Sequence, residues 1–251
     1  MASGYFEPAS PRVLAHRGLA LEAPENTLPA FEAARAVGAE YVETDVHLSR
    51  DGVAAIAHDP TLARVAGDEV PVSALTMDEL RAVDLGAGAG FATLEEALDA
   101  FPTLRFNIDV KVEAAVEATV AAVRRTGSAG RVLLTSFSDR RRRRLATAVP
   151  GVATSAGRGG VVRAVFAAPL GRKGAMVRAL AGAQALQVPE RAGALRVVTP
   201  PLIALAHAAG AEVHVWTVND PDDMRRLLAL GVDGLVTDRA DLALPLIRAR
   251  S

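Results

Sequence analysis

Short apolar runs alternate along the chain with longer segments in which Ala, Leu and Arg recur at helical spacing. The segment NDPDDMRRLLALG is typical of a helix, because Asn219 or Asp220 can cap it, Pro221 suits the first helical position and Gly231 can end it. Strands that alternate with helices predict a parallel sheet, and 251 residues is a usual length for a (β/α)8 TIM barrel. The expected strands are Arg12–His16, Glu40–His47, Val53–Ala57, Leu104–Val110, Val132–Thr135, Val152–Ser155, Ala185–Val188, Glu212–Val218 and Gly234–Thr237.

One strand more than a barrel needs is present in this list. The link SRDG before Val53–Ala57 is too short for a parallel crossover, so this strand is expected to fold back antiparallel on the second barrel strand. Eight parallel strands then remain. A short insertion is expected after the second barrel strand, together with this antiparallel strand. No domain boundary is visible, so residues 1–251 are expected to form a single domain. Residues 157–182 predict a helix with an irregular loop inside one connection.

The segment YVETDVHLSRDGVAAIAHD concentrates polar side chains on one strand face. Glu43, Asp45 and His47 are two residues apart and project together near the C-terminal end of their strand, where barrel enzymes keep their chemistry. A two-residue turn would set His58 opposite Asp45, and a four-residue turn would set it opposite Glu43, so either register brings His58 beside the carboxylates. His47 is expected at the rim of the site, with a ligand role as the alternative.

Two carboxylates that converge in a half-buried site must be protonated or share a cation. The sequence has no cysteine, which excludes disulfides and thiolate metal sites. Oxygen ligands without thiolate favour one divalent cation, Mg²⁺ or Ca²⁺, with Mn²⁺ as a further candidate. The alternative is an exposed strand face with solvated acids.

Two further motifs add charge at neighbouring strands. VLAHRG places His16 and Arg17 at a strand end, and FNIDVK places Asn107, Asp109 and Lys111 on one face of a strand expected to be buried. Together these motifs indicate a metal-assisted phosphoryl-transfer site. The acids would bind a cation, the cationic side chains would bind an anion, and the imidazoles have pKa values near neutral. One histidine would activate the nucleophile and the other would protonate the leaving oxygen.

Composition limits the other functions. The 28 Lys and Arg residues balance 29 Asp and Glu residues, which argues against a nucleic-acid partner. No secretory signal and no apolar run of transmembrane length are visible, so a soluble cytoplasmic protein without an integral membrane segment is expected. A monomer or a homodimer is expected.

These motifs resemble the glycerophosphodiester phosphodiesterase family, of the PLC-like phosphodiesterase superfamily. The matching segments, in the family's order, are AHRG, PENTLPAF, VETDVHLSRDG, AHDPTL, TLEEAL, FNIDVK, TSF, VHVWTVND and GVDGLVTDRADL. The resemblance implies a metal-dependent hydrolase that cleaves glycerophosphodiesters to sn-glycerol 3-phosphate and an alcohol. In the mechanism it implies, the glycerol 2-hydroxyl attacks phosphorus and the cyclic phosphate is then hydrolysed.

The resemblance also implies roles for residues that handle protons and substrate. His16 and His58 would be the general acid–base pair, Arg17 would bind phosphate, and Lys111 would lie near it. Trp216 would wall the substrate cleft at the end of the seventh barrel strand.

By the same resemblance, Glu43 and Asp45 would bind the metal, with Asp109 at the third acidic position. That position is usually glutamate in the family, so the shorter arm of Asp109 leaves the preferred cation open.

Two alternatives stay open: a lysophospholipase D-type activity on lysophospholipids, and a barrel that binds phosphodiesters without turnover. Glu25, Asn26 and Thr27 are expected to form a helix cap and a loop tether, and Asp59 is expected to orient His58.

Overall fold

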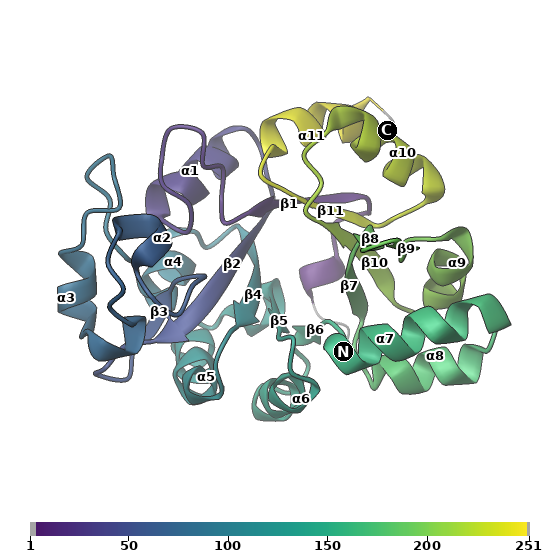
Figure 1. Cartoon of the computed structure of the whole chain (residues 1–251), viewed down its shortest axis with the longest axis horizontal. Helices are drawn as coiled ribbons and strands as arrows, with labels where there is room; N and C mark the ends of the chain where they lie inside the picture. Colours follow the sequence, from purple (N-terminus) through teal and green to yellow (C-terminus); the bar gives the residue numbers. More distant parts are fainter. Residues whose placement is uncertain (1–3, 250–251) are drawn as a thin grey trace.

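Eight parallel strands surround a common interior in the computed structural model, which describes residues 4–249 (Figure 1). They are hydrogen-bonded in the order β6-β5-β4-β2-β1-β11-β10-β7, and a parallel bridge between Ser155 and Ala185 nearly closes the ring. The predicted TIM barrel is confirmed, and each expected strand is present with ends within two residues of the prediction. The barrel strands are β1 (Arg12–His16), β2 (Tyr41–Leu48), β4 (Arg105–Val110), β5 (Val132–Thr135), β6 (Ala153–Thr154), β7 (Ala185–Pro189), β10 (Glu212–Trp216) and β11 (Gly234–Thr237).

Helices surround the strands on the outside of the barrel (Figure 1). Several begin where the sequence offers a cap: the Thr93 and Thr76 hydroxyls each accept an N–H in a capping box, and the Asp220 carboxylate caps the predicted 221–230 helix. The α-helices are α1 (Leu28–Ala36), α2 (Ala63–Ala66), α3 (Met77–Arg81), α4 (Leu94–Ala100), α5 (Val116–Arg125), α6 (Asp139–Ala148), α7 (Arg158–Ala167), α8 (Lys173–Leu180), α9 (Pro200–Ala208), α10 (Pro221–Leu230) and α11 (Ala240–Arg248). The 3-10 helices are η1 (Gly4–Phe6), η2 (Val72–Ala74), η3 (Glu113–Ala115), η4 (Ser128–Arg131) and η5 (Ala168–Leu170).

An apolar layer lies inside the barrel, and polar side chains gather at the C-terminal end of the strands. Leu14, Tyr41 and Leu133 form a buried cluster near the N-terminal ends of their strands, and Tyr5 of η1 packs into it. Two residues further along β1, on the same face as Leu14, lies His16. The fold therefore fills the bottom of the barrel and leaves polar side chains at its C-terminal end.

Strand β3 (Ala54–Ile56) pairs antiparallel with β2, as the short link predicts. The predicted registers are both wrong, because His47 lies opposite Ala55 and the turn has three residues. The backbone N–H of Ser49 bonds to the carbonyl of Val53, while the Ser49 hydroxyl accepts the N–H of Val53. His58 therefore lies beyond the ladder, and its backbone faces neither Glu43 nor Asp45.

The connection between β6 and β7 holds two helices, α7 and α8, joined by η5. The sequence predicts only one helix and an irregular loop there. Gly160 explains the close packing of the pair, since a Cβ at this position would lie 2.7 Å from the carbonyl oxygen of Ala179. After β7, the short hairpin of β8 (Arg191–Ala192) and β9 (Leu195–Arg196) was not predicted.

Candidate active site

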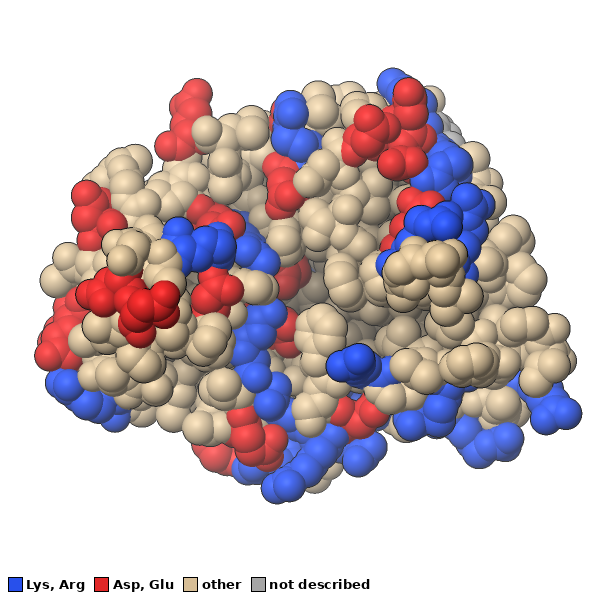
Figure 2. Space-filling view, viewed as in Figure 1, with Lys and Arg blue, Asp and Glu red and all other residues tan. Residues whose placement is uncertain are grey.

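A cavity of about 530 Å³ opens at the C-terminal end of the barrel, where Figure 2 shows the centre of the molecule hollowed. All the site residues predicted from the sequence line it, which places together side chains that lie up to 200 residues apart in the chain. These are His16, Arg17, Glu43, Asp45, His58, Asp109, Lys111 and Trp216.

Strand register arranges the polar side chains in two adjacent layers. His16, Glu43 and Asn107 are neighbours on β1, β2 and β4, and one layer further along, Asp45 is the neighbour of Asp109. Parallel neighbours in register carry their side chains on the same face, so both layers project into the cavity.

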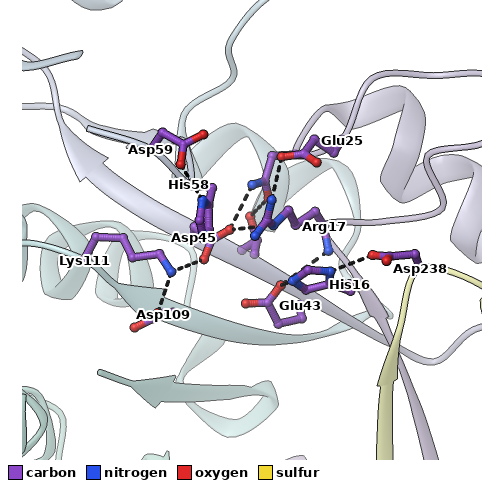
Figure 3. Close-up of polar contacts among 12 residues, drawn as sticks. His16, Arg17, Glu25, Glu43, Asp45, His58, Asp59, Asp109, Lys111 and Asp238 are labelled. Carbon is purple, nitrogen blue, oxygen red and sulfur yellow. Dashed lines mark hydrogen bonds and ion pairs between the residues drawn. The ribbon is translucent and has the colours of Figure 1, made fainter. Parts of the chain in front are cut away.

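Asp45 is surrounded by positive and amide partners (Figure 3). Lys111 Nζ lies 2.7 Å from Asp45 Oδ1 and 2.7 Å from Asp109 Oδ2. Asn26 Nδ2 donates to Asp45 Oδ2 at 3.0 Å, and Arg17 Nε lies 3.3 Å from the same oxygen. Burial alone would raise the pKa of Asp45, but Lys111 and Asn26 outweigh it and hold this pKa below its ordinary value. The two carboxylates in turn raise the pKa of Lys111 against the effect of its burial.

The charge of Glu43 is balanced by fewer close partners than that of Asp45. Its Oε2 atom lies 3.9 Å from His16 Nε2 and accepts the backbone N–H of Arg17 at 3.3 Å. Burial, and then the charge of Asp45, raise the pKa of Glu43 well above its ordinary value. Burial likewise raises the pKa of Asp109 in spite of Lys111.

Oxygen atoms without partners lie beside these acids. Within residues 4–249, the buried atoms Asn107 Oδ1 and Asp109 Oδ1 have no hydrogen-bond partner. Lys111 lies between Asp45 and Asp109, and the described part of the chain contains no group of three acidic or imidazole side chains already arranged around one metal position. The hard oxygen donors fit a cation such as Mg²⁺ or Ca²⁺ chemically.

His16 is held by a carboxylate that the sequence reasoning missed. Its Nδ1 atom lies 2.6 Å from Asp238 Oδ1, and because a carboxylate only accepts, Nδ1 carries the proton. Asp238 is fixed in turn by Asn219, whose Nδ2 donates at 2.6 Å and whose Oδ1 accepts the Asp238 N–H. The hydrogen bond from His16 lowers the pKa of Asp238. Both residues lie in segments that resemble the family, VHVWTVND and GVDGLVTDRADL, and this was the only signal available for them.

His58 is held in the same manner. Asp59 Oδ1 lies 2.8 Å from His58 Nδ1, so the predicted orienting contact of Asp59 is present. Asp59 Oδ2 accepts from Arg64 at 2.6 Å, Arg64 also donates to Glu25 at 2.6 Å, and Glu25 accepts from Arg17 at 2.8 Å. A chain of ion pairs therefore links one imidazole to the predicted phosphate-binding arginine.

The loop before α1 has a larger part in the site than a cap and a tether. Thr27 caps α1, as predicted, by accepting from Ala30 N. Asn26, however, bridges Asp45 and the hydroxyl of Thr44, and both Asn26 and Arg17 adopt left-handed backbone conformations with φ of 57° and 56°. Asparagine adopts this conformation readily, whereas it is uncommon for arginine and is found at constrained functional positions.

His47 lies at the edge of the site, as expected. It is buried, and its Nε2 atom donates to the backbone carbonyl of His58 at 3.2 Å. The contact fixes the backbone that carries His58.

The other half of the cavity is apolar. Trp216, at the end of the seventh barrel strand as predicted, lines it and meets the ring of Phe137 edge-on, with ring centroids 6.1 Å apart. Most of the remaining apolar lining comes from α7, from the β8–β9 hairpin and from the residue just beyond it, namely Val161, Val162, Val165, Phe166, Ala192, Leu195 and Val197.

The model of the glycerophosphoryl diester phosphodiesterase family matches residues 16–242. The chain belongs to this family. It is thus a hydrolase of phosphoric diesters on a TIM barrel, as the motifs predict. Over 239 residues it is 44% identical to "Probable glycerophosphodiester phosphodiesterase 2" of Mycobacterium tuberculosis. The match covers 94% of this chain and 90% of that protein.

Solved structures of this family share the fold. The structure of a glycerophosphodiester phosphodiesterase from Agrobacterium tumefaciens superposes with a TM-score of 0.78 at 26% identity, covering 94% of this chain and 99% of the other. An Oleispira antarctica phosphodiesterase in complex with the product sn-glycerol-3-phosphate superposes with a TM-score of 0.80 at 24% identity, covering 95% and 97%, and this likeness shows the fold alone.

Proposed function

We propose that this glycerophosphodiester phosphodiesterase family member releases sn-glycerol 3-phosphate and an alcohol from glycerophosphodiesters, with His16 and His58 as the acid–base pair. One observation carries the proposal: each imidazole donates a hydrogen bond from Nδ1–H to a carboxylate, Asp238 or Asp59, and both rings line one cavity. This contact fixes the tautomer in which Nε2 is free to exchange a proton with substrate.

The cations beside the histidines support a phosphate as the group bound between them. Arg17 and Lys111 line the same cavity, and Lys111 contacts two acids that hold it in place. A phosphodiester placed among them would have its charge balanced while one imidazole takes a proton from the attacking hydroxyl and the other protonates the leaving oxygen.

On β2 and β4 lie oxygen donors of the kind that suits a divalent cation. Glu43, Asp45 and Asp109 would hold it, and the unpartnered oxygen of Asn107 adds a further donor on the same face. When bound, the cation would supply positive charge for the phosphate oxygens. The raised pKa of Glu43 supports this assignment, since a buried acid beside another acid favours either a proton or a cation.

The proposal is tested by glycerol 3-phosphate release from glycerophosphocholine by the purified protein, with Mg²⁺, Ca²⁺ or Mn²⁺ and with EDTA. His16→Gln and His58→Gln are each expected to lower kcat by about 100-fold or more. The matched control is His207→Gln, because His207 is also paired with a carboxylate, Asp233, but lies outside the cavity. Equal loss in the His207 control, or unchanged turnover in both site variants, would refute the acid–base assignment.

Cation binding is measured separately, by calorimetry without substrate, and is expected to weaken in Glu43→Gln.

A lysophospholipase D-type activity is the second candidate, favoured by the apolar half of the cavity. Val162 and Phe166 line that half, where an acyl chain would avoid water. Turnover of lysophosphatidylcholine at a rate near that of glycerophosphocholine would support it, and turnover of glycerophosphocholine alone would reject it. Binding of both with no turnover of either would instead favour the non-catalytic barrel. The cytoplasmic location and the monomeric or homodimeric state stay predictions from the sequence.

A further inference from the structure

Positive charge is concentrated in one fifth of the chain. Residues 140–189 contain ten of the 28 Lys and Arg residues and none of the 29 Asp and Glu residues. Some of these cations are accounted for within the fold: Arg144 pairs with Glu113 and Glu117, and Arg142 is buried against the carbonyl of Ala181. The exposed ones that form no ion pair with any residue in 4–249 are Arg140, Arg143, Arg158, Arg172, Lys173 and Arg178.

Exposed apolar side chains gather at the same place. Of the seven large hydrophobic side chains that the described residues expose, four lie on α7, η5 and α8, and two more, Phe137 and Leu195, line the cavity beside α7 residues. Phe166 is 72% exposed and Leu170 is 63% exposed. We call the exposed side chains of α7, η5 and α8 the α7–α8 surface, made up of Arg158, Val162, Arg163, Phe166, Leu170, Arg172, Lys173, Val177 and Arg178.

Folding does not require this surface to be apolar. The two helices bury a different set of side chains, which includes Ala164 of α7 and Met176 and Ala179 of α8. In Figure 2 the outer part of these helices, at the lower right, shows cationic and uncharged residues and no acidic ones. Exposed aromatic and aliphatic side chains among unpaired cations indicate a partner that is both anionic and apolar.

We propose that the α7–α8 surface docks on an anionic lipid bilayer, with Phe166 and Leu170 inserted at the headgroup level and the cations against the lipid phosphates. Helices with cations beside aromatic and aliphatic side chains bind interfaces in this way, through buried apolar area together with attraction to anionic lipids. A nucleic acid would leave the exposed apolar side chains without a function, and an apolar protein face would leave the cations unpaired. The bilayer satisfies both sets at once.

Docking would also orient the cavity. Arg158, Val162 and Phe166 belong both to the α7–α8 surface and to the cavity lining. The apolar half of the cavity would then open toward the lipid, which suits a substrate drawn from the bilayer. The binding measured below requires no turnover, so its failure is distinct from a failure of the proposed function.

Co-sedimentation with vesicles tests the docking directly. The purified full chain is mixed with vesicles of equal parts phosphatidylcholine and phosphatidylglycerol, or of phosphatidylcholine alone, at low and at high salt. We expect sedimentation with the anionic vesicles, at least about tenfold weaker binding to the neutral ones, and loss of most binding at about 1 M salt, where the Debye length is short. Equal binding to both vesicle types, or no binding to either, would overturn the proposal.

Two variants separate charge from insertion. Arg172→Gln/Lys173→Gln/Arg178→Gln is expected to weaken binding to anionic vesicles about tenfold or more, and Phe166→Ser/Leu170→Ser by about tenfold. The matched controls are Arg35→Gln/Arg125→Gln/Arg225→Gln, which removes equal charge elsewhere, and Leu21→Ser, which removes the remaining large exposed hydrophobic side chain. Thermal melting confirms that each variant is folded. Losses as large in the controls, or wild-type binding in both variants, would show that the α7–α8 surface is not the docking site.

Discussion

Asp238 fixes the orientation and tautomer of His16 from the far end of the chain. Asp238→Asn keeps the size of the side chain but replaces a pure acceptor with a group that can also donate, so Nδ1 of His16 is no longer required to carry the proton. We expect kcat for glycerophosphocholine to fall about 100-fold with KM changed less than about threefold. Asp233→Asn is the control, since Asp233 also pairs with a histidine, at Nε2 of His207, outside the cavity. An equal fall in kcat in the control would attribute the loss to the fold.

Lys111 stabilises two buried carboxylates at once. Lys111→Met removes the cation that contacts both Asp45 and Asp109 at 2.7 Å and leaves Arg17 beside Asp45 alone, so we expect the free energy of unfolding in EDTA to fall by about 3 kcal/mol. The other lysine of the sequence, Lys173, is exposed and unpaired within the described residues, and Lys173→Met is expected to change stability by less than about 0.5 kcal/mol. Urea titrations of both variants measure the difference. A change in Lys111→Met no larger than in Lys173→Met would mean that solvent already screens this pair of acids.

At the scale of elements, alternation and turn length predict much of the fold. Strand positions follow from short apolar runs between helical segments, and the antiparallel β3 follows from a link too short for a crossover. The hairpin register could not be predicted in this way, because the Ser49 hydroxyl accepts the backbone N–H of Val53 and this contact favours a three-residue turn. Asp238 was missed for a related reason: its partner His16 is 222 residues away, and only the closed barrel brings β1 and β11 together.

The α7–α8 pair is another element that sequence periodicity could not predict, since its packing depends on the absence of one side chain. A Cβ at Gly160 would lie 2.7 Å from the Ala179 carbonyl oxygen and 3.2 Å from Ala156 Cβ. Gly160→Ala is therefore expected to destabilise the protein by about 1–2 kcal/mol, even though alanine favours the helix. Gly174→Ala in α8 is the matched control, because its Cβ would meet only the end of the Arg178 side chain at 3.5 Å. Thermal melting should show opposite signs, with a gain of about 0.5–1 kcal/mol for Gly174→Ala. Destabilisation of equal size in both would contradict close packing as the cause.

In the whole molecule, the proposed chemistry lies at one end of the barrel and a buried ion pair links strands at the other end. At the end opposite the cavity, Arg12 on β1 donates to both oxygens of Glu212 on β10, at 2.6 and 2.9 Å, across the intervening β11. Burial would raise the pKa of Glu212, but hydrogen bonds from Arg12 and His214 outweigh it and lower this pKa to about 2, from an ordinary 4.5. A lowered carboxyl pKa gives stability that is complete above the unfolded pKa and is lost as the pH falls through the folded one.

We therefore expect the contacts of Glu212 with Arg12 and His214 to contribute together about 3 kcal/mol at neutral pH, which disappears between pH 4.5 and about 2. Glu212→Gln tests the contribution by denaturant unfolding over that range: the variant is less stable than the wild type at pH 7, and the two curves converge toward pH 2. Because the pair lies outside the cavity, kcat/KM at neutral pH should change less than about threefold in the folded variant. A stability difference that does not depend on pH would assign the loss to packing at the base of the barrel. A large fall in kcat/KM would instead show that the Arg12–Glu212 pair at one end of the barrel helps to position the histidines at the other end.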